Sequence, residues 1–166
     1  NYIRYRILDK NEIGELVKDL KDCRERQNEA VAEMLDDLLK QGETQLNRKC
    51  MFFMLNNDTD AEVTGLIGNK LLAMYQRPLF ILRLRDEQYA GSMRSVGTES
   101  FLEIANSTEL CLCQGHPNAA GAFIDEDKFE QFKEVIEEEL KDIEFSINIE
   151  ADIELEASQI NEQLVK

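Results

Sequence analysis

The run at 79–84, Leu-Phe-Ile-Leu-Arg-Leu, constrains the fold more than any other stretch of the 166-residue chain. Because it is apolar at almost every position, a strand made from it presents apolar side chains to both faces of its sheet. Such a strand has to lie inside a sheet that is covered on both sides. Asp86 and Glu87 supply a turn directly afterwards, and 88–94 is predicted to form a second strand. Since the connection is so short, the two strands are expected to be antiparallel neighbours.

Helical periods on either side of these strands predict the covering layers. Apolar residues recur on one face over 11–22, 24–46, 63–74, 99–105 and 129–140. In the third of these helices the expected apolar face consists of Val63, Leu66, Ile67, Leu71 and Met74. Further strands are predicted over 49–55 and 119–124, and an alternating strand begins at Phe145. The predicted class is α/β, a mixed β-sheet flanked by helices with an N-terminal helical connector.

The net charge of −15 argues on its own against a nucleic-acid partner, because phosphates require Lys and Arg. The charge is unevenly distributed, however. Residues 66–95 contain five Lys and Arg against two acids, whereas residues 96–166 contain four Lys and eighteen acids. A small basic region can therefore face a phosphate while the acidic surface faces solvent.

The cysteines and the single histidine set limits on metal chemistry and on the compartment. A zinc site usually needs four Cys or His ligands, and with one His the four cysteines are expected to be reduced thiols. Reduced thiols predict a cytoplasmic protein. Cys111 and Cys113 are expected to point the same way from an extended segment. No window approaches eighteen uncharged apolar residues, so no membrane partner is expected.

The first motif that suggests a binding site is a small polar cluster at the end of the second predicted strand. It consists of Gly91, Ser92, Met93, Arg94 and Ser95. Arginine offers a planar fork of donors that fits phosphate oxygens, and the serines add hydroxyl donors. Taken alone, these residues also fit an ordinary turn with a surface arginine, so both interpretations stay open at this point.

The second motif surrounds the only histidine. It runs through Gly115, His116, Pro117, Asn118, Ala119, Ala120 and Gly121. Gly and Pro predict a loop here, and the small residues allow another molecule to approach closely. A histidine in such a loop can donate to a phosphoryl oxygen, although a structural role is an equal alternative. A third glycine pair, Gly65 and Gly68, lies within a helical period and is interpreted as close helix–sheet packing.

The order of these motifs resembles the DHH phosphoesterase superfamily, in particular the DHH-associated domain of RecJ-like single-strand-specific exonucleases. The similar stretch runs from about Gly65 to Ile124 and passes through both motifs. Gln114-Gly115-His116 stands where the family usually has Gly-Gly-His, and Asp60 to Thr64 replace a common Trp-His pair. These departures indicate a divergent or phage-type member.

The resemblance implies that this chain is the substrate-binding part of a larger nuclease. The family's catalytic domain holds divalent metal, Mn²⁺ or Mg²⁺, through Asp-His-His motifs that are absent here, so this chain is expected to hold no cofactor or metal and to be inactive alone. By analogy the binding residues are Gly91, Ser92, Arg94, Ser95, Gly115, His116 and Asn118. His116 would support catalysis by contacting the scissile phosphate, and Gly91 and Gly115 would make room for the strand.

The same resemblance divides the chain into three parts. Residues 1–47 are expected to be a helical connector from a missing catalytic domain, 48–144 the substrate-binding domain, and 145–166 the start of a following domain. The expected partners are single-stranded nucleic acid and the missing domain of the same protein. The alternatives are an oligonucleotide or cyclic-dinucleotide phosphodiesterase of the same superfamily, and a protein-interaction module on the same fold.

Overall fold

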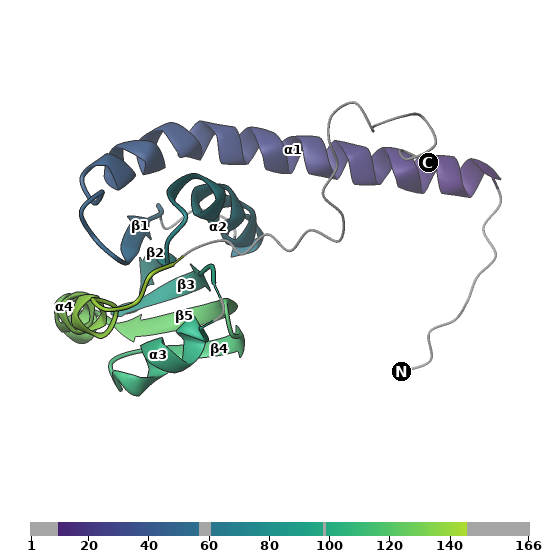
Figure 1. The fold of residues 1–166 in the computed structure, drawn as a ribbon. Helices are drawn as coiled ribbons and strands as arrows, with labels where there is room; N and C mark the ends of the chain where they lie inside the picture. The colour runs from purple at the N-terminus through teal and green to yellow at the C-terminus, as the bar shows by residue number, and fades with distance from the viewer. Residues whose placement is uncertain (1–9, 57–60, 98, 146–166) are drawn as a thin grey trace, which may run out of the picture.

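The sheet lies between two layers of helices, as Figure 1 shows. The computed structural model describes residues 10–56, 61–97 and 99–145. Helices α1 (Lys10–Glu43) and α2 (Ala61–Tyr75) enclose one apolar core against the sheet, and α3 (Phe101–Ser107) and α4 (Phe129–Glu139) enclose another. This arrangement confirms the predicted α/β class. The strand and helix expected over 145–166 lie almost wholly outside the described residues.

Five strands form the sheet in the order β1-β2-β3-β5-β4. Their bounds are Met51–Met54, Leu79–Arg85, Gln88–Arg94, Leu112–His116 for β4 and Ala119–Asp125 for β5. β1 pairs with β2 in parallel, and all other pairs are antiparallel, so the antiparallel neighbours predicted around Asp86 and Glu87 are confirmed. A 3-10 turn, Glu126–Lys128, leads from β5 into α4.

The central strand β2 is buried on both faces, as its sequence predicts. Leu79 and Ile81 belong to the core under α1 and α2, whereas Phe80 and Leu82 belong to the core under α3 and α4. The second core is rich in aromatic rings, and Phe80 packs edge-on against Phe132 with ring centroids 5.4 Å apart. These two cores fix which face of the sheet each alternate residue occupies.

Helix α1 corrects the prediction of two separate helices over 11–22 and 24–46. It is continuous from Lys10 to Glu43, because the residues around Cys23 include neither Pro nor Gly to interrupt the period. Only its second half joins the body, where Val31 and Leu38 are buried. Its first half exposes an apolar stripe made of Ile13, Leu16, Val17 and Leu20.

Helix α2 buries a different face from the one predicted from the sequence. Val63, Ile67 and Leu71 are buried, but Leu66 and Met74 are exposed. The buried stripe turns toward the side that carries Gly65 and Gly68. A Cβ at Gly68 would lie 2.8 Å from Cδ1 of Ile81, and one at Gly65 would lie 3.1 Å from Nη2 of Arg94. The interpretation of these glycines as close helix–sheet packing is therefore confirmed.

Side-chain amides cover both outer edges of the sheet. Gln41 of α1 and Gln45 in the turn after it each pair with one residue of β1, donating to its carbonyl and accepting from its N–H at 2.7–2.9 Å. At the other edge Asn106 of α3 does the same with Cys113 of β4, at 3.0 and 2.7 Å. Each amide occupies the place of a neighbouring strand.

Candidate nucleic-acid interface

On one face of the sheet, α2 covers part of β3 and leaves the neighbouring strands β5 and β4 largely uncovered. Residues that alternate with the buried Met93, Cys113, Ala120 and Ala122 point to the α2 side of the sheet, where α2 packs mainly on β2 and β3. We call this surface the open face. Its residues are Gln88, Ala90, Ser92 and Arg94 on β3, Ala119, Gly121, Phe123 and Asp125 on β5, and Leu112, Gln114 and His116 on β4.

The open face brings the two sequence motifs into one row. Arg94 and His116 are both cross-strand partners of Ala119, which lies on the strand between them. Two strand spacings separate the Cα atoms of Arg94 and His116 by about 10 Å. Because Ala119 is small, no large β5 side chain stands in the row between Arg94 and His116.

The Arg94 side chain is held in place before any ligand binds. Its Nε donates to Oδ1 of Asn69 at 3.1 Å and its Nη1 donates to the Met93 carbonyl at 2.8 Å. Gly65 and Gly68 leave the space in which the side chain lies under α2. Partial burial lowers the pKa of the Arg94 guanidinium from its usual value, although arginine stays protonated at neutral pH. A partly desolvated and fixed guanidinium is well suited to bind phosphate oxygens.

The two serines of the first motif have different positions. Ser92 lies on the open face, where its hydroxyl is 3.1 Å from Oγ1 of Thr64. Ser95 is buried beyond the end of β3, and its hydroxyl donates to the Val96 carbonyl at 3.3 Å. The structure thus places Ser92 beside Arg94 on the open face and holds Ser95 within the body.

Gly91 and Gly115 both face away from the open face. A Cβ at Gly91 would lie 1.9 Å from the Ile81 carbonyl oxygen, so the close approach of β2 requires a glycine. Gly115 has φ +147, and a Cβ there would lie 2.9 Å from Cα of Ala120. Both glycines thus serve strand pairing. On the open face itself, small residues at Ala119 and Gly121 leave the space instead.

His116 corrects the prediction of a loop at the second motif. It is the last residue of strand β4 and is exposed, and only Pro117 and Asn118 form the turn to β5. A two-residue connection keeps both strands paired up to His116 and Ala119. The Asn118 side chain accepts from Phe101 N at 3.3 Å and donates to the Gly97 carbonyl at 3.1 Å. Asn118 therefore ties this turn to the segment that follows β3.

Gln114 and Phe123 are open-face residues that the sequence motifs did not mark as binding residues. Gln114 lies next to Gly121, and Phe123 is 39% exposed in the row that also holds Ala90 and Leu112. Period-two alternation along 112–116 and 119–125 was the available signal, because it places both side chains on the face of His116.

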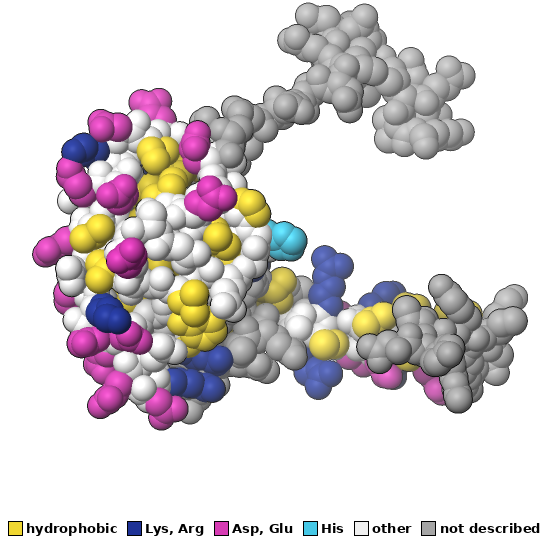
Figure 2. Space-filling view, turned by 90° about the horizontal axis from the view of Figure 1, so that it is seen from below, with side chains coloured by type: hydrophobic (Ala, Val, Ile, Leu, Met, Phe, Trp, Pro, Cys, Tyr) yellow, Lys and Arg dark blue, Asp and Glu magenta, His cyan; other side chains and the backbone are white. Residues whose placement is uncertain are grey.

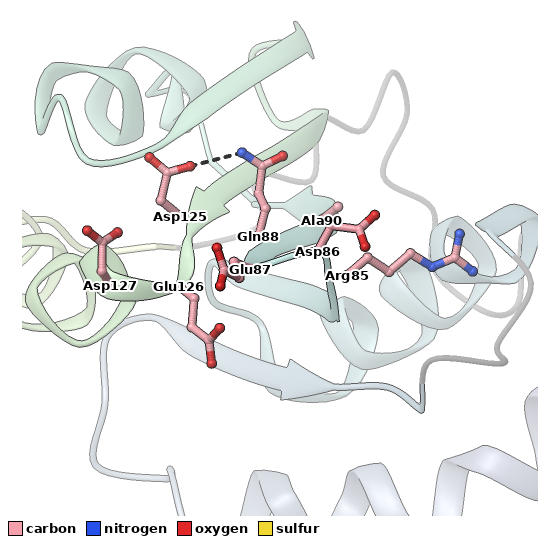
Figure 3. A pocket seen from close by; sticks show the side chains of 8 residues that line it. All are labelled: Arg85, Asp86, Glu87, Gln88, Ala90, Asp125, Glu126 and Asp127. Carbon is pink, nitrogen blue, oxygen red and sulfur yellow. Dashed lines mark hydrogen bonds between the residues drawn. The ribbon is translucent and has the colours of Figure 1, made fainter.

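The far end of the open face is acidic. Figure 3 shows the pocket there, about 830 Å³ in volume, with Gln88 donating to Asp125 at 2.9 Å. Five of its lining residues are acids: Asp86, Glu87, Asp125, Glu126 and Asp127. Within 10–56, 61–97 and 99–145, no group of three or more His, Cys, Asp or Glu is placed to hold a metal ion.

Acidic side chains are also scattered across the face of the body that Figure 2 shows from below, with few basic ones among them. The cysteines are all free thiols, and the Sγ atoms of Cys111 and Cys113 lie 3.9 Å apart, which confirms that both point the same way. No helix in the described part of the chain is long and apolar enough to cross a membrane.

Comparison with known proteins identifies the family. The family model described as the DHHA1 domain matches residues 47–142. The chain belongs to the DHHA1 domain family. A putative single-strand DNA-specific exonuclease, YorK, derived from the SPbeta prophage of Bacillus subtilis, is 26% identical over 127 residues, which cover 70% of this chain and 22% of YorK. Bacillus phage SPbeta has a putative exonuclease with the same identity and coverage.

Solved structures agree with this DHHA1 assignment. RecJ of Thermus thermophilus in complex with Mg²⁺ matches with a TM-score of 0.67 and 26% identity, over 85% of this chain and 22% of RecJ. An exonuclease RecJ bound to manganese matches with a TM-score of 0.59 and 25% identity, over 82% of this chain and 34% of that protein. The chain is thus a RecJ-like DHH-associated domain. It spans about a fifth of the length of the phage exonuclease relatives.

Proposed function

We propose that the open face binds the backbone of single-stranded nucleic acid as the substrate-binding part of a RecJ-like exonuclease. The row formed by Arg94, Ala119 and His116 carries this proposal, because it presents a fixed guanidinium and an exposed imidazole on one side of a flat sheet. Arg94 binds a phosphate, with Ser92 beside it. His116 donates to a second phosphoryl oxygen and supports hydrolysis of the scissile bond.

The chemical step belongs, in this proposal, to another part of the nuclease. The phage relatives are several times longer than this chain, and the similar RecJ structures were solved with Mg²⁺ or manganese. Manganese or magnesium held by that other part would supply the activated water. The exposed apolar stripe on the first half of α1 fits a contact with that part. The DHHA1 body then closes the substrate cleft from one side.

Binding of a fluorescently labelled oligothymidylate to the 166-residue chain tests the proposal. Arg94→Ala should weaken binding by about tenfold or more, since a charge-assisted contact contributes roughly 1.5–3 kcal/mol. It should also reduce the salt dependence by about one phosphate contact. Lys141→Ala is the matched control, because it removes one positive charge at an exposed site beyond α4.

Equal effects of Arg94→Ala and Lys141→Ala would contradict a specific phosphate contact. A second measurement addresses the chemical step. The chain alone, supplied with manganese and a single-stranded substrate, should show no hydrolysis. Clear turnover that survives purification to a single species would show that the chain carries its own catalytic centre.

A further inference from the structure

The open face carries an aromatic side chain at a defined distance from the Arg94 row. Phe123 is 39% exposed, and its cross-strand partners are Ala90 on one side and Leu112 on the other. Phe123 lies four residues along β5 from Ala119, which is about 13 Å at the rise of a strand. Two extended nucleotide units span such a distance.

The Phe123 ring leans toward the Arg94 row. A Cβ added to Gly121 would lie 4.0 Å from Cε2 of Phe123, so the ring edge reaches over the glycine between the two rows. Gly121 and Ala119 leave a low floor along β5, and the exposed amide of Gln114 borders it on β4. A planar group that enters from the Arg94 row therefore meets no β5 side chain larger than alanine on this face before it reaches the ring.

A hollow opens on the other side of the ring. Its volume is about 490 Å³, and Leu110, Leu112 and Phe123 supply its apolar wall. Gln88 and Lys128 also line it together with Glu109 and Asp125, and both donate to Asp125 at its border. This combination of one ring, apolar neighbours and a few polar groups is typical of a surface that holds a nucleobase.

The charge pattern decides which part of a nucleotide fits here. Beyond Phe123, Asp125 and the acids around the neighbouring pocket repel phosphate. At the opposite end, Arg94 attracts it. A strand bound along β5 is therefore oriented with its phosphates at the Arg94 row and an uncharged group at Phe123. The acidic end also disfavours any further phosphate beyond that position.

We propose that Phe123 stacks on a nucleobase of the bound single strand, and that this base is the last that the open face accommodates. The proposal rests on the proposed function, because the strand must be held by its phosphates at the Arg94 row. Stacking on an aromatic ring tolerates every base, so this subsite contributes affinity without sequence preference.

Three variants and two ligands test the stacking contact. The ligands are a labelled oligothymidylate and an abasic oligonucleotide of the same length and charge. Phe123→Leu should bind the oligothymidylate roughly tenfold more weakly than the unmodified chain does. It should bind the abasic strand with the same affinity as the unmodified chain. Met74→Ala is the control, because it removes an exposed apolar side chain on α2 outside the open face. Circular dichroism verifies the fold of each variant.

The Phe123→Trp variant supplies a direct signal, because the chain contains no other tryptophan. This variant should retain the affinity of the unmodified chain for the oligothymidylate. Its tryptophan fluorescence should be quenched when the oligothymidylate binds and should stay unchanged when the abasic strand binds. If Arg94→Ala weakens binding while Phe123→Leu does not, the stacking proposal alone is overturned. If the unmodified chain binds neither ligand, the proposed function fails, and the stacking proposal fails with it.

Discussion

Single glycines in this sheet have opposite functions, and substitutions should separate them. Gly91 and Gly121 lie on adjacent strands, but a Cβ at Gly91 would overlap the Ile81 carbonyl, whereas one at Gly121 meets nothing closer than 3.8 Å. Gly91→Ala should therefore lower the free energy of unfolding by about 3 kcal/mol or more. Gly121→Ala should change it by less than about 1 kcal/mol. Urea denaturation measures both.

The binding assay complements this pair of variants. Gly121→Ala adds a methyl group to the floor between Arg94 and Phe123, so it should weaken oligonucleotide binding while the fold stays intact. A Gly91→Ala variant as stable as the unmodified chain would show that β2 and β3 have room to separate. That result would contradict the structural role assigned to Gly91.

The residues of the candidate site were easier to predict than their arrangement. Arg94 and His116 were identified from residue type and from the neighbouring small residues. Their shared row depends on β5 lying between β3 and β4, and no local pattern encodes that strand order. Alternation alone could have separated Ser92 and Arg94 from Gly91, since adjacent residues of a strand face opposite sides.

Among the elements, β1, β2, β3 and β5 were predicted because their signals are local, whereas β4 was missed because Gly115 and Pro117 indicated a loop. The apolar run of β2, the short turn before β3 and the small residues of β5 each lie within a few positions. The continuity of α1 was missed because amphipathic periods do not show whether two helical segments join. The exposed positions of Leu66 and Met74 were missed because the glycines of α2 rotate its buried face toward Arg94.

Helix α1 consists of two parts that should respond differently to the same substitution. Leu38 is 1% exposed in the core under α1 and α2, whereas Leu20 is 70% exposed on the first half of the helix. Leu38→Ala should lower the free energy of unfolding by about 2–5 kcal/mol. Leu20→Ala should change it by less than about 0.5 kcal/mol. If both variants lose the same unfolding free energy in thermal or urea denaturation, the first half of the helix also packs on the body.

The amides at the β1 edge offer a further test at the scale of elements. Gln41→Ala leaves the N–H and carbonyl of Met54 without this partner, and should cost roughly 1–3 kcal/mol of unfolding free energy. Gln131→Ala is the control, since Gln131 is exposed on α4. A cost no larger than that of the control would show that water replaces the amide without loss.

At the scale of the whole molecule, the reactivity of the cysteine thiols shows which parts of the body are inaccessible to a reagent in solution. Burial raises the pKa of Cys50 well above its usual value, and the hydrogen bond with Cys111, together with burial, raises that of Cys113. Cys23 is exposed on α1. At mildly alkaline pH, iodoacetamide should therefore modify Cys23 first, while Cys50 and Cys113 react only after denaturation. Mass spectrometry of a labelling time course identifies the order, and early labelling of Cys50 would contradict the closed core.

The amide-covered edges of the sheet also bear on how the molecule behaves in a crowded solution. Gln41 and Gln45 at one border and Asn106 at the other already use the backbone groups through which a second chain would add a strand. Two copies that meet edge to edge thus find part of each border closed to intermolecular β-structure. A sheet with one partly uncovered face can in this way stay open to a ligand without becoming a template for aggregation.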